Sequence, residues 1–285
     1  MTYRDPGNII IDEAISFMMR ILAVVNNKGG VGKSTTCINL GASLGEMGYK
    51  VLLVDIDPQA SLTVGMGLNA VMGKSMADVM RGDKSVEQAM QRGPVKNIWV
   101  AGGRAELTDS QYALYRRGDV ETLKEQLASL NGNFDFTIID CGPGQDFLTT
   151  NALVAADRAI IPTRSQFFDM LGVGQFLNIL GRVLETMNPS LKYWVAVTFY
   201  EKSTRDAREN LEQAERYFGP TLLRSLIKKT VKIAEAPAVG LPVTEYAPRC
   251  EGAEQYRCMA REIVERLEKN ENLKTLAEEA ERQVV

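Results

Sequence analysis

The sequence contains no histidine, so the side chain that most often acts as a general base near neutral pH is missing. Any acid–base chemistry must therefore use carboxylates, lysines or bound water. Cysteine is scarce as well: the chain has four, none of them in a C-x-x-C pair, at Cys37, Cys141, Cys250 and Cys258. Neither a zinc site nor a disulfide framework is predicted, and we interpret the cysteines as small packing residues.

Long apolar runs are absent too. No run approaches the roughly 20 residues that cross a bilayer, and the N-terminus lacks the charged start, apolar middle and cleavage site of a secretory signal. We therefore expect a cytoplasmic protein. The formal net charge is −3, so any binding of nucleic acid must come from a local basic patch. The chain has 285 residues, 45% of them hydrophobic, which is enough for a sizeable core.

A glycine-rich stretch follows the apolar run 21–25, and residues 26–35 read N-N-K-G-G-V-G-K-S-T. Glycines let successive backbone N–H groups point into one concavity, and the helix that follows adds the positive end of its dipole. In the pattern G-x-x-x-x-G-K-[ST], Lys33 would reach the β- and γ-phosphates and the Ser34 hydroxyl would ligate Mg²⁺. The stretch therefore predicts a site for a nucleoside triphosphate with magnesium. A glycine-rich turn that binds nothing is the alternative, and the strand-then-helix context disfavours it.

Two apolar runs further along the chain end in carboxylates. Asp55 and Asp57 follow the first run, and Asp140 follows the second. Open α/β sheets place their ligands at the carboxyl ends of parallel strands, so we expect these three side chains beside the glycine-rich loop. A strand end where Asp starts a turn is the simpler alternative for Asp55 and Asp57, and the glycine-rich loop upstream disfavours it.

Strands and helices alternate along most of the chain, which predicts βαβ units with right-handed crossovers. The fold class is therefore α/β, a mostly parallel twisted sheet flanked by helices on both faces. Helices are expected over residues 36–47, 109–130, 149–157, 172–187 and 204–218, and strands over 97–100, 159–162 and 193–199. Residues 60–108 show no clear period. We expect a short extension over 1–20, one domain over 21–265 and a helical tail over 266–285.

The run K-G-G-V-G-K-S, with Asn27 in place of the first glycine and an extra Lys28, resembles the deviant Walker A motif of the ParA/MinD ATPases. The segments D-x-D-P-Q at 55–59 and A-E-A-P at 234–237 agree, so the resemblance covers about residues 20–260. It implies the P-loop NTPase fold. It also implies a homodimer in which Lys28 of one subunit reaches the nucleotide held by its partner.

The same resemblance assigns roles around ATP and Mg²⁺. Asp57 would position or activate the attacking water and act in catalysis with Lys28 and Lys33, while Asp55 and Asp140 would join Ser34 in the magnesium shell. The nucleotide contacts that it implies are Lys28, Gly29, Gly30, Val31, Gly32, Lys33, Ser34, Thr35 and Pro237. The family usually has D-x-P-P where this chain has Gly142, and acidic residues where it has Gln166 and Leu171.

A basic segment near the A-E-A-P motif resembles the part of the family that touches DNA. It contains Lys228, Lys229 and Lys232, with Arg249 further on. The resemblance implies that these residues bind DNA without reading its sequence. From charge alone, a solvated lysine-rich loop is at least as good an interpretation.

Taken together, the resemblance implies a weak, partner-stimulated ATPase that dimerises with ATP and binds non-specific DNA. It would position plasmid or chromosomal DNA over the nucleoid with a ParB-like or other adaptor. One alternative is a ParA-like positioner of protein cargo, such as carboxysomes or chemoreceptor clusters. Another is a metabolic P-loop enzyme that phosphorylates or amidates a small substrate. Membrane binding is not expected, because the tail carries Glu278, Glu279 and Glu281 instead of a basic amphipathic surface.

Overall fold

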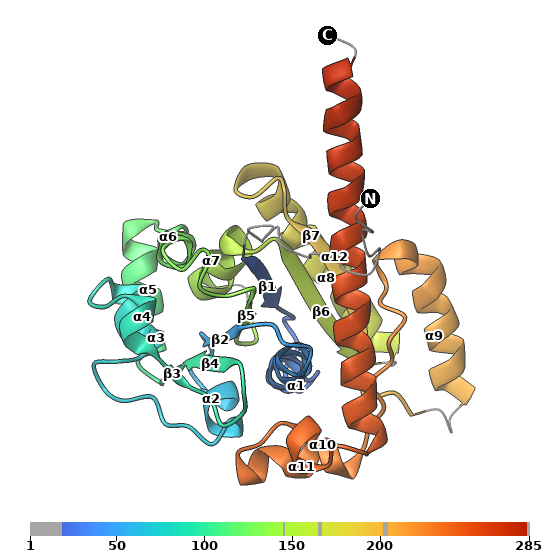
Figure 1. The fold of residues 1–285 in the computed structure, drawn as a ribbon, viewed down its shortest axis with the longest axis horizontal. Helices are drawn as coiled ribbons and strands as arrows, with labels where there is room; N and C mark the ends of the chain where they lie inside the picture. The colour runs from blue at the N-terminus through green and yellow to red at the C-terminus, as the bar shows by residue number, and fades with distance from the viewer. Residues whose placement is uncertain (1–18, 145, 165–166, 202–204, 284–285) are drawn as a thin grey trace, which may run out of the picture.

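The computed structural model describes residues 19–144, 146–164, 167–201 and 205–283. Nearly all of the extension expected over 1–20 lies outside these ranges, as does Gln166. The strands are β1 (Arg20–Val24), β2 (Val51–Asp55), β3 (Met90–Arg92), β4 (Ile98–Ala101), β5 (Phe136–Asp140), β6 (Arg158–Arg164) and β7 (Lys192–Thr198). They form one sheet in the order β3-β4-β2-β5-β1-β6-β7. Every neighbouring pair is parallel except β3 and β4, which confirms the predicted fold class (Figure 1).

The helices alternate with these strands. They are α1 (Lys33–Glu46), α2 (Ser61–Gly65), α3 (Met76–Arg81), α4 (Val86–Ala89), α5 (Leu107–Arg117), α6 (Thr122–Ala128), α7 (Phe147–Ala155), α8 (Phe167–Thr186), α9 (Arg205–Phe218), α10 (Val231–Glu235), α11 (Val243–Tyr246) and α12 (Glu251–Gln283). Two short 3-10 turns, η1 (Gly219–Thr221) and η2 (Ala236–Val239), lie in the C-terminal third.

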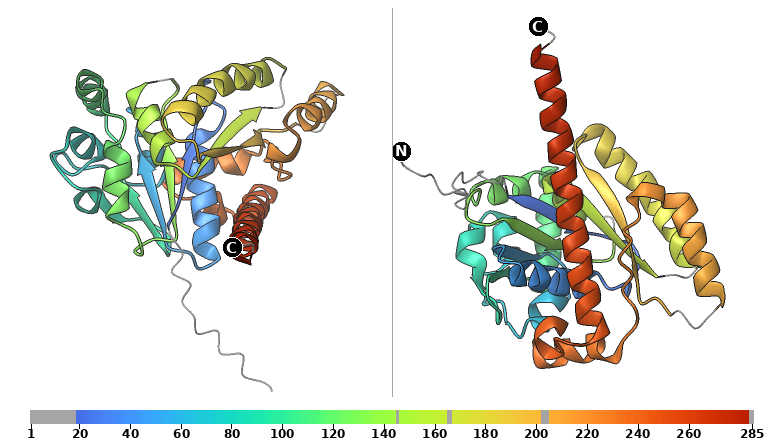
Figure 2. Two further views of the ribbon diagram at one scale, coloured as in Figure 1. Left: turned by 90° about the horizontal axis from the view of Figure 1, so that it is seen from above. Right: turned by 45° about the vertical axis from the view of Figure 1, so that its right-hand side comes forward.

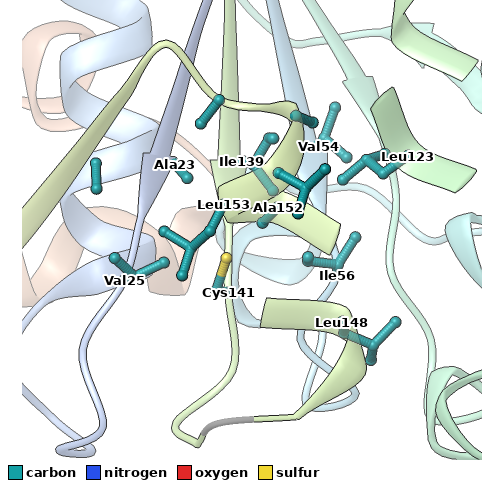
Figure 3. Packing of buried hydrophobic residues seen from close by; sticks show 14 of the residues in the cluster. Ala23, Val25, Val54, Ile56, Leu123, Ile139, Cys141, Leu148, Ala152 and Leu153 are labelled. Atoms are coloured by element: carbon teal, nitrogen blue, oxygen red, sulfur yellow. The ribbon is translucent and has the colours of Figure 1, made fainter. Parts of the chain in front are cut away.

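Helices cover both faces of the sheet, because successive strand residues point to opposite sides. In β1, Leu22 and Val24 pack in the layer under α1 and α12, whereas Ala23 packs in the layer under α7 and α8. Figure 2 shows helices on both faces of the sheet. Figure 3 shows the second layer, where Cys141 and Ile139 lie beside Ala152 and Leu153 of α7. Both layers consist of closely packed, buried apolar side chains, which hold the strands and their ends in place.

The four cysteines divide into two groups. Cys37 and Cys141 are fully buried, as expected of packing residues, and burial raises the pKa of each thiol, with the Asp140 charge adding to the effect. Cys250 is partly buried, and Cys258 is exposed, so the packing interpretation is wrong for Cys258.

Helix α12 joins the body through its first five turns. Its buried side chains Tyr256, Met259, Ile263 and Leu267 pack in the α1 layer, and the helix then continues beyond the rest of the fold (Figure 1). It runs without a break through residue 266, where the tail was expected to begin. The domain boundary drawn there stays a prediction.

The prediction of a single helix over residues 109–130 is wrong. The chain forms α5 and α6 instead, because Gly118 adopts a left-handed conformation with φ 64° and ends α5. The Asp119 carboxylate then accepts hydrogen bonds from the backbone N–H of Thr122 at 3.1 Å and from its hydroxyl at 2.6 Å, which starts α6.

Candidate nucleotide-binding site

The glycine-rich loop joins the end of β1 to the start of α1. Gly30 and Gly32 have φ of 69° and 86°, a left-handed conformation that favours glycine. Gly32 is the N-cap of α1, and no side chain of the described protein caps that end. The first N–H groups of α1 are therefore available for an anion, as the phosphate-loop prediction requires.

The beginning of the loop is fixed by Asn26. This buried side chain donates to the Pro162 carbonyl of β6 at 2.7 Å and accepts from the Lys28 N–H at 3.0 Å. Lys28 itself is exposed, and its role at a dimer interface stays a prediction. Lys33 is only 7% exposed, and its ammonium donates to the Lys28 carbonyl at 3.3 Å.

The second half of the loop is held from outside by residues that the sequence did not indicate. Arg164, at the end of β6, donates from Nε at 3.1 Å and also from Nη2 to the Gly30 carbonyl. Thr198, at the end of β7, donates its hydroxyl to the Val31 carbonyl at 2.8 Å. Phe199 has φ of 50°, a strained conformation that costs of order 1–3 kcal/mol, and a Cβ added to Gly32 would lie 3.0 Å from its ring.

The two predicted carboxylate strands are neighbours, and Asp55 pairs with Asp140 in the register of β2 and β5. Asp140 is fully buried, and within the described chain neither of its carboxylate oxygens has a hydrogen-bond donor. Burial raises its pKa well above the ordinary value, and the Asp55 charge raises it further. The Ser34 hydroxyl and Lys33 act in the opposite direction, although Ser34 does not reach hydrogen-bonding geometry.

This orphaned carboxylate fits a cation. Buried charges in proteins are normally paired or bound to a metal, and Mg²⁺ prefers oxygen ligands from one or two carboxylates together with water and phosphate. No group of three or more acidic or cysteine side chains in the described residues forms a ready-made metal cage. The remaining ligands would come from Ser34, the phosphates and water.

Asp55 has a different environment. One of its oxygens accepts from the Thr63 hydroxyl at 2.6 Å and from the Thr63 N–H at 2.9 Å, and the other accepts from the Asp57 N–H at 3.1 Å. Burial outweighs the lowering effect of these hydrogen bonds, so the pKa of Asp55 is raised to about 6. The side chain thus ties the end of β2 to α2, and its place in the magnesium shell stays a prediction.

Asp57 lies just beyond β2 and is 7% exposed. One oxygen accepts from the Gln59 N–H at 2.9 Å, which holds the carboxylate over the turn that leads to α2. Gly142, the departure from the family motif, lies against it: a Cβ there would be 3.4 Å from Asp57 Oδ1. The segments after β2 and β5 therefore meet at Asp57.

Pro237 lies in η2, next to α2. A Cβ added to Gly65 would be 3.6 Å from the Pro237 side chain, and Gly240 approaches the Gly67 backbone so closely that a Cβ would lie 2.5 Å from its Cα. The A-E-A-P segment is thus packed on the segment that follows Asp57. Contact between Pro237 and a nucleotide stays a prediction.

The lysines of the candidate DNA surface form ion pairs with neighbouring glutamates. Lys229 pairs with Glu201 at 3.0 Å, Lys232 pairs with Glu235 at 2.8 Å, and Lys228 pairs with Glu251. Arg249 is exposed near the start of α12. Each of the three lysines therefore meets a glutamate, which the sequence reasoning did not anticipate.

The fold, the anion-binding loop and the buried carboxylates at neighbouring strand ends define a P-loop nucleotide-binding protein. Residues 19–193 match the family model described as an AAA domain. The chromosome-partitioning ATPase Soj of Treponema pallidum is 37% identical over 251 residues, spanning 87% of this chain and 98% of that protein. The chain belongs to the ParA/Soj-type partition ATPases of the ParA/MinD family.

Two further proteins support this assignment. The sporulation initiation inhibitor protein Soj of Bacillus subtilis is 35% identical over 249 residues, 86% of this chain and 98% of that protein. A solved structure described as cobyrinic acid a,c-diamide synthase from Mycobacterium smegmatis, with bound ADP and magnesium, has a TM-score of 0.78 and 33% identity. It covers 89% of this chain and 97% of its own. No described helix is long and apolar enough to span a membrane.

Proposed function

We propose that this protein is an ATPase that dimerises with ATP, binds non-specific DNA and positions plasmid or chromosomal DNA with a ParB-like partner. The observation that supports this most is the loop itself, where exposed Lys28 and buried Lys33 share one turn above the orphaned Asp140 carboxylate. The relatives named as chromosome-partitioning proteins support the proposed cellular role.

Mg²⁺ and ATP are the ligands that fit the loop. Lys33 would leave the Lys28 carbonyl for the β- and γ-phosphates, and the free N–H groups of α1 would receive the remaining phosphate oxygens. Ser34 and Asp140 would hold the metal, with Asp55 behind them. When bound, Mg²⁺ neutralises charge that develops on the phosphates during transfer.

Hydrolysis would depend on Asp57 and Lys28. Asp57 is held over the site by the Gln59 N–H, with a second oxygen left to orient a water for in-line attack on the γ-phosphate. Lys28 of the partner subunit would stabilise the charge on the same phosphate. Loss of that phosphate removes the group that both subunits share, so the dimer would reopen.

DNA binding would use Lys228, Lys229, Lys232 and Arg249 of both subunits. The three ion pairs are on the surface, where such pairs are worth only about 0–1 kcal/mol, so phosphates can replace the glutamates. Each phosphate contact releases counterions and adds about 0.9 to the salt slope of binding. The resulting protein would be cytoplasmic and associated with the nucleoid.

A filter-binding experiment tests this surface. Lys228, Lys229 and Lys232 changed together to Glu should abolish retention of duplex DNA by the ATP-loaded chain while ATP binding stays intact. Changing Lys74, Lys84 and Lys96 to Glu is a matched control, because these exposed lysines lie elsewhere in the sequence and give the same change in charge. If both triple variants retain duplex DNA equally well, the assignment of DNA binding to these lysines is wrong.

A second function has one specific observation in its favour, the diamide synthase description of the Mycobacterium smegmatis structure. An amidating enzyme that takes ammonia from glutamine needs an activated thiolate, usually beside histidine. This chain has no histidine, and both cysteines near the site are buried with raised pKa. ATP turnover measured with DNA, and separately with glutamine and a corrinoid acid, separates the two. We expect a response to DNA alone.

A further inference from the structure

The carbonyl groups of the phosphate loop are held by two strand ends that no motif connects to it. Arg164 of β6 binds the Gly30 carbonyl with two N–H groups, and Thr198 of β7 binds the next carbonyl, Val31. These contacts span 134 and 167 residues of sequence. Arg164 also lies over the Phe199 ring, 5.7 Å from its centroid, which limits where the guanidinium can go.

Because of peptide geometry, these contacts also set the direction of two backbone N–H groups. A trans peptide is planar, and its C=O and N–H point in opposite directions. Fixing the Gly30 carbonyl toward Arg164 therefore fixes the Val31 N–H on the far side of the loop. Fixing the Val31 carbonyl toward Thr198 does the same for the Gly32 N–H.

We propose that Arg164 and Thr198 are positioning residues for ATP, which turn two consecutive N–H groups of the loop toward the phosphates. The inference rests on the proposed function, because it requires that this loop binds a nucleotide. Neither side chain touches the phosphates itself; each acts through a loop carbonyl. Gly30 and Gly32 suit the arrangement, because a Cβ at Gly30 would lie 3.1 Å from Arg164 Nη2 and one at Gly32 would meet Phe199.

The inference predicts a specific kinetic signature. A preoriented N–H stabilises bound substrate and transition state alike, so its loss raises KM with little change in kcat. Arg164→Gln should weaken ATP binding about tenfold, equivalent to about 1.4 kcal/mol. Thr198→Val, which removes only the hydroxyl donor, should act in the same direction, and Thr198→Ser should restore wild-type binding.

Arg158 offers a matched control at the other end of β6. It too donates to a backbone carbonyl, Asp157 at 2.8 Å, and lies over an aromatic ring, Trp194 at 5.6 Å. Arg158→Gln should therefore lower the thermal unfolding midpoint without changing KM for ATP. If the Arg164 and Thr198 variants lost affinity for ATP only because the fold is less stable, Arg158→Gln would lose affinity as well.

The experiment is titration calorimetry of the full chain with ATP and Mg²⁺, together with steady-state ATPase rates. Weaker binding with raised KM in Arg164→Gln and Thr198→Val, reversed in Thr198→Ser, supports the inference. Unchanged affinity, or a fall in kcat with KM unchanged, overturns it while the proposed function stands. A wild-type chain that binds no ATP would overturn both.

Discussion

At the scale of single residues, the three carboxylates of the site differ in how their charges are supported. Asp55 has three hydrogen-bond donors, whereas Asp140 has none within the described protein. Asp140 therefore destabilises the nucleotide-free fold, because a buried charge without a partner is costly. Such a cost is typical of a residue kept for a ligand.

Asp140→Asn should raise the unfolding midpoint of the nucleotide-free chain at pH 8 and weaken binding of ATP with Mg²⁺. Its raised folded pKa means that the native state takes up a proton before the unfolded chain does, so wild-type stability from this group rises as pH falls. The gain from Asp140→Asn should therefore shrink between pH 8 and pH 5. Scanning calorimetry of both chains without nucleotide, at pH 8 and pH 5, measures this gain. An unfolding midpoint of Asp140→Asn below that of the wild type at pH 8 would contradict the prediction.

Asp57→Ala should leave ATP binding in place while turnover falls by about 100-fold or more, the range expected when a group that handles the attacking water is lost. The matched control is Asp83→Ala, which removes an exposed carboxylate remote in sequence. Phosphate release under single-turnover conditions gives the comparison. Unchanged turnover in Asp57→Ala would refute its role.

At the residue scale, the positions of the candidate residues could be predicted where the pattern is local, and their roles stay predictions. The loop 28–35 and its Lys33 follow from spacing within eight residues, and the carboxylates follow from strand ends. Arg164 and Thr198 were missed because each acts on a carbonyl more than 130 residues away. An arginine that ends a strand carries no signal for such a contact.

At the scale of elements, long segments were predictable and short ones were not. Strands such as β2 and β5 are fully buried, and their apolar runs showed them directly. Between residues 60 and 108 the helices α2, α3 and α4 have only 5, 6 and 4 residues, too few for a helical period. The starts of α3 and α4 are capping boxes, Ser75 with Asp78 and Ser85 with Gln88, a sequence signal that could have located these two helices.

Helix α12 offers a prediction at this scale, because Glu262 ties it to the segment after η1. The carboxylate accepts from the N–H groups of Arg224 at 2.8 Å and Ser225 at 2.9 Å, and pairs with Arg266 at 2.7 Å. Burial alone would raise the Glu262 pKa, but these contacts hold it below the ordinary value of 4.5.

Glu262→Gln should lower the free energy of unfolding by about 1 kcal/mol at pH 7. Because the folded pKa of Glu262 is depressed, its stabilisation is present above the unfolded pKa and is lost as pH falls through the folded value. The difference from wild type should therefore shrink as pH falls below 4.5 and disappear below the folded pKa of Glu262. Urea unfolding at pH 7 and in acid tests this, with exposed Glu265→Gln as the control that should match wild type.

At the scale of the whole molecule, Lys28 is exposed, whereas the candidates Lys33 and Asp57 are buried. The account requires that the Lys28 faces of two subunits close on each other around ATP. Dimer closure and nucleotide state then become one event, and the paired lysine surfaces of both subunits act on DNA together.

The most direct test is the association state of the Asp57→Ala chain in sedimentation velocity, with ATP and Mg²⁺ and separately with ADP. The account predicts a dimer with ATP and a monomer with ADP. The double variant with Asp57→Ala and Lys28→Ala should be a monomer with ATP and with ADP, although it still binds ATP. A chain that binds ATP and yet sediments only as a monomer would contradict the shared-nucleotide dimer on which the proposed function depends.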